Sequence, residues 1–336
     1  MNTQVLYIIF LLFLMFLGLN LSSIKKENFL SKYKFIFALL AIFLSGKIIF
    51  ITIIFVLLIL SLLRFLYQKQ KLNLFLSLII GISAIEIYKI LFLQMGYISE
   101  TISIFGLGFC LIKFTDLLIY NERKINNLWL FILNDFSIYL NPFNMLAGPV
   151  STFNNAHKSY KPKTNYYVLS RFSKGILFIL VGIFFQDLSN ESKINFLSIS
   201  SSSSILIFMF SLLTSAISIY FIYAGYTDIA ISSSSASNEF LPENFSKPFL
   251  KTNLIDFWKS WNMSVTKWVT GVIYLPAFVF LKERFPHQAK QFSTLTVFIT
   301  IGLWHGISLS WFLWGLHQGI GWVITDGIMN KKKLFQ

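Results

Sequence analysis

Charged residues are scarce in this chain of 336 residues, and acidic residues are the rarer kind. Only 12% of the residues are Asp, Glu, Lys or Arg, whereas 55% are hydrophobic. A soluble globular domain carries about 25% charged residues, so roughly half of the usual water-facing charge is missing. This deficit excludes an ordinary cytosolic enzyme and an intrinsically disordered chain, and it indicates a membrane protein.

Cysteine is nearly absent as well. The single cysteine, Cys110, lies in an apolar stretch with no histidine close to it in sequence. One thiol excludes a disulfide framework and a paired-thiol centre, and the sequence contains no metal-ligand spacing. We therefore expect no metal site, and we expect Cys110 to be structural and not a covalent acyl carrier.

The positive charge of the chain does not indicate a nucleic-acid partner. Lys and Arg total 28 against 14 Asp and Glu, which gives a net charge of +14. The basic residues form short clusters between apolar runs, which is how membrane proteins set their orientation. We expect contacts with membrane lipids and none with nucleic acid.

A transmembrane helix needs about 20 apolar residues, and eight to ten segments qualify as spans. The first, 4–21, has no basic region before it and no cleavage site after it, so we expect a retained helix. Segments 128–146 and 265–281 are also compatible with re-entrant or interfacial helices. The candidate spans are 4–21, 35–63, 72–93, 97–120, 128–146, 168–188, 204–224, 265–281, 293–311 and 312–328. We expect one membrane domain over 1–336, with N-terminal transmembrane helices in 1–99.

A few polar residues interrupt these apolar segments, where polar groups are costly and often functional. Asp228, in Tyr-Thr-Asp-Ile-Ala, has no adjacent basic residue, so it either organises the fold or contacts substrate. His305 is either catalytic or hydrogen-bonded to a neighbouring helix. On one continuous helix His317 would lie about 18 Å further along the axis, so the two histidines should differ in function. Segment 241–268, rich in Trp and Lys, is by itself typical of an interfacial helix. Because it lies between hydrophobic spans, it is also compatible with a polar segment that lines protein or a wet cavity.

Four ordered blocks resemble a known family. GLWHGISLSWFLWGLHQG (302–319) resembles the signature of the membrane-bound O-acyltransferases. It follows YAGYTDIAI (223–231), LPENFSKPF (241–249) and FWKSWNMSVTKW (257–268) in the family's order. The chain is most similar to the bacterial branch that includes the alginate O-acetylation and teichoic acid D-alanylation membrane proteins. GLGFCLIKFTDLLIY (106–120) and LAGPV (146–150) also resemble that branch's upstream helix and Gly-Pro turn. The resemblance therefore covers roughly residues 100–328, and residues 1–99 agree only in hydropathy.

Three features depart from the pattern of that branch. Asn262 stands where the branch usually has His, although the sterol and diacylglycerol acyltransferases have Asn in a similar block. A serine run, 232–237, replaces a Gly-rich stretch, and segment 269–301 is short. These departures bear on the acyl donor and the partner more than on the fold.

The resemblance implies an all-α polytopic membrane protein, in which a ring of about eight to ten helices surrounds a central cavity or tunnel. His305 would be the general base, since histidine titrates near neutral pH. Asn262 would donate to the oxyanion or orient the thioester. The residues expected to bind substrate or shape the tunnel are His317, Asp228, Trp258, Trp261 and Trp304.

The resemblance also implies the partners. The donor would be an acyl-CoA or acyl carrier protein thioester, with no bound cofactor. The acceptor would be a hydroxyl of a cell-envelope polysaccharide, and an extracytoplasmic helper protein would assist at the bacterial cytoplasmic membrane. Acetyl and D-alanyl groups both remain open. Two alternatives also stay open: an inactive family member that acts as an assembly partner, and a transporter or flippase-like protein, although no internal repeat supports the latter.

Overall fold

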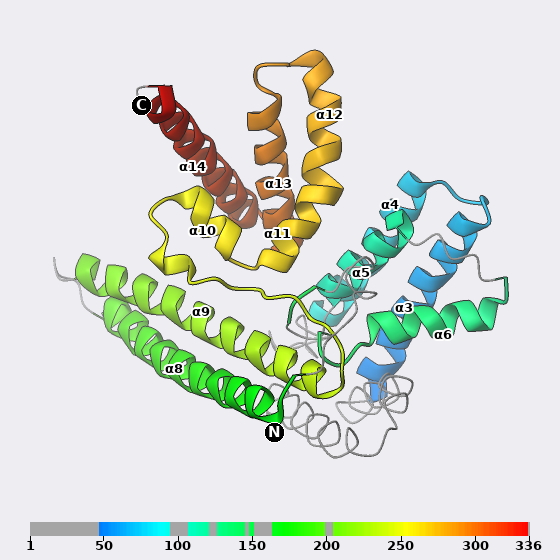
Figure 1. Ribbon diagram of the computed structural model, residues 1–336, viewed down its shortest axis with the longest axis horizontal. Helices are drawn as coiled ribbons and strands as arrows, with labels where there is room; N and C mark the ends of the chain where they lie inside the picture. The colour runs from blue at the N-terminus through cyan, green and yellow to red at the C-terminus, as the bar shows by residue number, and fades with distance from the viewer. Residues whose placement is uncertain are drawn as a thin grey trace. The chain divides into compact units, whose positions relative to one another are not determined.

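All the regular structure that can be described is helical (Figure 1). The computed structural model describes residues 47–94, 107–120, 126–144, 148–150, 163–198 and 204–334. They belong to two compact units, Met1–Pro242 and Glu243–Gln336. The predicted all-α class is confirmed. The ring of helices and the single domain over 1–336 stay predictions.

The first unit contains six of the labelled helices. They are α3 (Lys47–Gln68), α4 (Leu74–Gln94), α5 (Leu107–Tyr120), α6 (Leu128–Tyr139), α8 (Asn165–Ser198) and α9 (Ser204–Ala236). Its apolar core includes fully buried side chains of α3, α5, α6 and α9, among them Leu60, Phe114, Tyr139 and Ile229. The core also holds an ion pair, in which Arg64 Nε donates to Asp135 Oδ2 at 3.1 Å.

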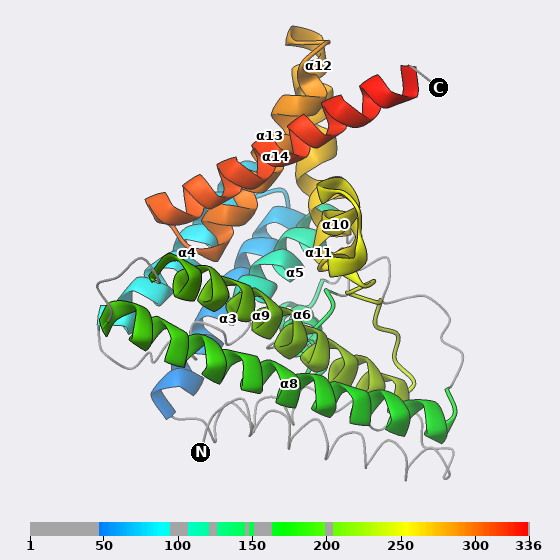
Figure 2. The same cartoon turned by 90° about the vertical axis from the view of Figure 1, so that its left-hand side faces the viewer.

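Helices α8 and α9 form an antiparallel hairpin and lie side by side along their lengths (Figures 1 and 2). A Cβ atom on Gly175 would lie 2.8 Å from the carbonyl oxygen of Gly225, so the two backbones touch there. Small residues at such positions let membrane helices pack closely. Further along, the Ser189 hydroxyl donates to the carbonyl oxygen of Ser211 at 3.1 Å. This hairpin is the frame that carries Asp228.

The second unit consists of shorter helices followed by a long hairpin. Its elements are η2 (Pro248–Leu250), α10 (Leu254–Ser260), α11 (Met263–Val269), η3 (Thr270–Tyr274), α12 (Leu275–Arg284), α13 (Ala289–His305) and α14 (Leu309–Leu334). η3 is one π-helical turn between α11 and α12. α13 and α14 pack antiparallel: Gly315 lies against Phe298 and Ile299, and the Lys290 ammonium binds both carboxylate oxygens of Asp326.

Three helical stretches within the described ranges are long and apolar enough to cross a membrane. They are Asn165–Ser192, Ile205–Ala236 and Met263–Arg284. They correspond to the predicted spans 168–188, 204–224 and 265–281. The predicted span 4–21, the part of 35–63 before Lys47, and 97–106 lie outside the described residues.

Several predicted helix boundaries are wrong. The 128–146 helix ends at Tyr139, because Asn141 and Pro142 turn the chain and the Asn141 side chain accepts from Phe143 N at 3.1 Å. The 293–311 helix ends at His305, and α14 begins at Leu309 instead of residue 312. The serine run 232–237, which replaces a Gly-rich stretch, is a helix end, since α9 continues to Ala236.

Candidate active site

His305 is the last residue of α13, directly before a break in the helical hairpin. Residues 306–308 connect it to α14. The Ser308 hydroxyl accepts from the backbone N–H of Trp311 at 3.3 Å and so caps the first turn of α14. The His305 side chain, at the end of α13, is exposed.

Three indole rings surround the imidazole of His305. The Trp311 ring is stacked on it, with centroids 5.0 Å apart and planes inclined by 27°. Trp304 contacts it at 4.9 Å and Trp314 at 5.8 Å, the latter edge to face. The predicted site residues His305 and Trp304 therefore share one aromatic cluster, together with two tryptophans that sequence reasoning did not single out.

The glycine that follows His305 makes room for this stacking. A Cβ atom on Gly306 would lie 2.6 Å from Cδ1 of Trp311 and 2.9 Å from its Nε1. A side chain at 306 would therefore push the indole away from the imidazole. The Trp-His-Gly sequence thus has a packing reason: glycine lets the ring from α14 lie over the chain next to His305.

Trp258 connects α10 to the same cluster. Its ring lies 6.0 Å from that of Trp314 and 5.4 Å from that of Phe298 on α13. Its indole nitrogen is buried and has no hydrogen-bond partner. Trp258 is thus joined to His305 through Trp314, and its expected part in shaping the tunnel stays a prediction.

Trp261 belongs to a second aromatic cluster, formed by rings from the segment 245–261. It stacks on Phe257 at 5.6 Å and meets Phe245 edge to face at 5.2 Å. Its ring also lies 6.1 Å from that of Phe249. These contacts give Trp261 a packing function beside the α10–α11 corner. Its expected contact with substrate stays a prediction.

His317 lies on α14 and is exposed. The helix breaks between His305 and His317, so the distance expected on one continuous helix does not apply. The packing of α13 on α14 still keeps the two histidines apart. Gly315 is level with Phe298 and Ile299, so His317 is level with about residue 297, roughly 12 Å along the hairpin from His305. Different functions for His305 and His317 remain the prediction.

Asn262 forms the corner between α10 and α11. Its φ and ψ angles of 46° and 50° lie in the left-handed region, which Asn tolerates better than most residues. The expected single amphipathic helix over 241–268 is therefore wrong, because the chain turns sharply here between two helices of 7 residues. The turn is itself one reason for an asparagine at 262.

Asn244 holds this corner, and sequence reasoning missed it. Its side-chain oxygen accepts from the backbone N–H and the hydroxyl of Ser264, at 3.1 Å and 2.7 Å, and its carbonyl oxygen accepts from Met263 N at 2.8 Å. The residue is fully buried. The sequence shows only an asparagine inside the Leu-Pro-Glu-Asn-Phe block. That pattern does not distinguish a residue that binds the α10–α11 corner from one that makes a turn.

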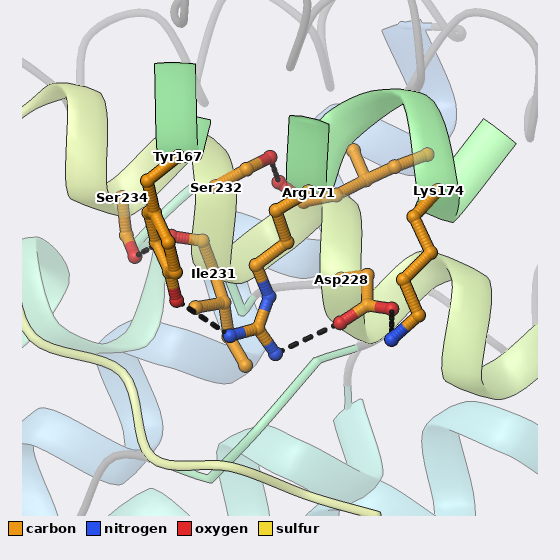
Figure 3. A network of polar contacts seen from close by, with 8 residues as sticks. Tyr167, Arg171, Lys174, Asp228, Ile231, Ser232 and Ser234 are labelled. Carbon is orange, nitrogen blue, oxygen red and sulfur yellow. Dashed lines mark hydrogen bonds and ion pairs between the residues drawn. The ribbon is translucent and has the colours of Figure 1, made fainter. Parts of the chain in front are cut away.

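Asp228 lies in the other unit, on α9, and has two basic partners from α8 (Figure 3). Arg171 and Lys174 each approach one of its carboxylate oxygens at 2.8 Å. Arg171 also donates to the Tyr167 hydroxyl at 2.7 Å. The lack of a basic neighbour in sequence was therefore misleading, since folding supplies two, and the geometry favours the fold-organising alternative.

The described residues hold no group of three or more His, Cys, Asp or Glu side chains able to bind a metal ion. Cys110 is buried in α5, among the core residues of the first unit. His287 lies exposed in the turn between α12 and α13, whereas His157 lies outside the described residues.

Comparison with known proteins decides the family. Residues 29–330 match the membrane-bound O-acyltransferase family over most of the chain. The chain belongs to this family. The predicted family is confirmed, and the aromatic cluster around His305 lies within the residues that match it.

The relatives of this O-acyltransferase family member include proteins named for peptidoglycan, teichoic acid and alginate. A peptidoglycan O-acetyltransferase of Helicobacter pylori is 26% identical over 192 residues, which are 55% of this chain and 36% of the relative. A teichoic acid D-alanyltransferase of Streptococcus thermophilus is 29% identical over 119 residues, which are 34% of this chain and 29% of the relative. A probable alginate O-acetylase of Pseudomonas putida is 25% identical over 199 residues, 58% and 40% of the two chains. The chain thus matches two fifths or less of the length of these relatives.

Proposed function

We propose that this membrane protein is an O-acyltransferase of the bacterial cytoplasmic membrane. It moves an acetyl or D-alanyl group from a thioester donor to a hydroxyl of a cell-envelope polysaccharide. One observation carries the proposal: His305, within the family match, stands exposed at a helix break among three indole rings. The names of the relatives support the reaction type and the kind of acceptor.

Besides the two substrates, the reaction needs a general base and a donor to the oxyanion. His305 takes the proton of the acceptor hydroxyl while its oxygen attacks the thioester carbonyl. The tetrahedral oxyanion collapses, the carbon–sulfur bond breaks, and the imidazolium returns the proton to the leaving thiolate. Enclosure of the site by the membrane would limit hydrolysis of the donor.

Asn262 is the proposed oxyanion donor. Its amide N–H₂ group can stabilise the negative oxygen, as asparagine side chains do in other acyl-transfer sites. The corner between α10 and α11, held by Asn244, fixes the position of this residue. His317, Trp258, Trp261 and Trp304 would line the path of the substrates. Asp228 has two cationic partners, so its proposed function changes from substrate contact to helix clamp.

The donor, acceptor and helper remain parts of the proposal. An acyl-CoA or an acyl carrier protein would deliver the thioester from the cytoplasm, and an extracytoplasmic helper protein would receive or direct the acyl group. No bound cofactor is needed, because the thioester itself is the activated group.

The test is the ester content of envelope glycans, measured by mass spectrometry in a set of strains. They are the wild type, a deletion strain, and the deletion strain complemented with the wild-type, His305→Ala or His287→Ala gene. His287 is the matched control, because it is an exposed histidine in the same unit but lies in the turn before α13.

We expect one ester to vanish in the deletion strain, to stay absent with His305→Ala, and to return with His287→Ala. The mass that is lost identifies the acyl group. Restoration of the ester by His305→Ala would instead support a non-catalytic assembly partner. No change of any ester in the deletion strain would contradict transfer to an envelope glycan.

A further inference from the structure

We propose that Trp311 is a positioning residue for His305, which holds the imidazole by its face and stabilises the imidazolium formed during proton transfer. This inference rests on the proposed function, because it concerns the charge that His305 acquires as general base. Trp311 lies outside the set of site residues predicted from the sequence.

The geometry distinguishes Trp311 from the other indoles. Its plane is inclined by only 27° to the imidazole, at a centroid distance of 5.0 Å, so the imidazole lies over the indole face. The Trp314 ring is perpendicular and more distant, and Trp304 is inclined by 54°. A cation within about 6 Å of the face of a tryptophan is attracted by the negative charge of that face.

The backbone fixes Trp311 on both sides. Gly306 leaves space for the indole, and the carbonyl oxygen of Trp311 lies 2.3 Å from where a Cβ atom of Gly302 would be. The Ser308 hydroxyl accepts from the Trp311 N–H at 3.3 Å. The Trp311 backbone is thus fixed at the start of α14, and the glycine at 306 leaves the space in which the indole lies beside His305.

The charged groups around α13 lie mostly away from its His305 end. On α12, Lys282, Glu283 and Arg284 are at the end that leads into the start of α13, and η3 has no charged residue. On α14, Asp326 pairs with Lys290 near the start of α13, Lys331, Lys332 and Lys333 follow Asp326, and His317 lies about 12 Å from His305. On α10 and α11 the charged residues are Asp256, bound to Asn253, and the exposed Lys259 and Lys267.

The helix ends act in opposite directions. The C-terminal end of α13 favours a cation at His305, whereas the N-terminal end of α14 disfavours it. The indole face adds to the first effect. Removing that face should therefore make the imidazolium form less stable.

The experiment measures the rate of acyl transfer against pH in membranes supplied with labelled acetyl-CoA, or with labelled D-alanine, ATP and a cytosolic fraction that provides the acyl carrier protein and its ligase. The variants are Trp311→Leu, which removes the aromatic face, and Trp311→Phe, which keeps one. Trp322→Leu is the matched control, because Trp322 lies on the same helix with its ring 5.4 Å from the Lys290 ammonium. Nuclear magnetic resonance of labelled histidine in the detergent-solubilised protein gives a second readout, with the His305 signal assigned from His305→Ala.

A general base works in its neutral form, so the rate rises with pH through the midpoint of His305. We expect Trp311→Leu to move this midpoint about half a pH unit lower, Trp311→Phe to move it less, and Trp322→Leu to leave it in place. The His305 resonance should move in the same way.

An unchanged midpoint in Trp311→Leu, by rate or by resonance, would overturn the inference. If Trp311→Leu is inactive at every pH, the resonance decides. If the wild type shows no His305-dependent transfer, the proposed function fails, and the resonance still tests the contact between the two rings.

Discussion

At the residue scale, Asn262 has to satisfy two requirements. Its backbone is in the left-handed region at the corner between α10 and α11. Its amide is the proposed donor to the oxyanion. Few side chains meet both requirements, because most residues with a large side chain are strained at a positive φ. The replacement of histidine by asparagine at this position is therefore compatible with a working site.

Substituting Asn262 by glycine separates the two requirements. Glycine adopts the left-handed region without strain, so we expect Asn262→Gly to fold with a thermal midpoint close to that of the wild type. Loss of the amide should lower the transfer rate by about 100-fold, the effect of removing one oxyanion donor. The assay is label transfer in membranes, with thermal unfolding of the purified protein as the control. A glycine variant of normal activity would show that Asn262 only makes the turn.

Local sequence indicates candidate site residues more readily than the residues that pack against them. His305 and Asn262 were singled out because ordered motifs and polar groups in apolar segments are visible in the sequence. The two cations that bind Asp228 were not, since they come from another helix and only packing brings them together. The same holds for Arg64, whose carboxylate partner Asp135 lies on another helix, and for Asn244.

At the element scale, the α13–α14 hairpin positions the site. A Cβ atom on Gly302 would lie 2.3 Å from the carbonyl oxygen of Trp311. That atom is backbone and cannot move without shifting α14. The helix boundary at His305, which the sequence reasoning placed at residue 311, follows from the same contact and from the Ser308 cap.

Gly302→Ala should therefore displace the first turn of α14 and the ring of Trp311 from His305. We expect a loss of transfer of at least 10-fold, because small misplacements of catalytic groups lower rates strongly. Gly327→Ala is the matched control on α14, where nothing lies within 4 Å of an added Cβ atom. Equal activity of Gly302→Ala and Gly327→Ala would contradict this account of the hairpin.

The α8–α9 hairpin offers the corresponding test for Asp228. The Arg171 and Asp228 side chains are only 13% and 7% exposed, whereas Lys174 is 54% exposed. Breaking a buried ion pair costs about 3 kcal/mol, whereas an exposed pair contributes about 0–1 kcal/mol. We expect Asp228→Asn and Arg171→Met to lower the unfolding midpoint clearly, and Lys174→Met to leave it nearly unchanged. A stable Asp228→Asn variant that had lost only activity would restore the substrate-contact alternative.

At the scale of the whole molecule, the acidic groups with described ion pairs all join two helices. Arg64 pairs with Asp135, Arg171 and Lys174 with Asp228, and Lys290 with Asp326. Pairing is how charges persist inside a membrane protein. His305 stands exposed at a helix break with three indole rings around it. This position, within the residues that match the family, is the structural reason to propose the chemistry at His305.

The central claim is that His305 carries out acyl transfer, and label transfer in isolated membranes tests it most directly. Membranes from the deletion strain, complemented with the wild-type, His305→Ala or His287→Ala gene, receive labelled acetyl-CoA in one arm. In the other arm they receive labelled D-alanine, ATP and a cytosolic fraction that provides the acyl carrier protein and its ligase. The account predicts base-labile label in the envelope glycan, in one arm only, for the wild type and His287→Ala and none for His305→Ala. Equal labelling by His305→Ala membranes would contradict it.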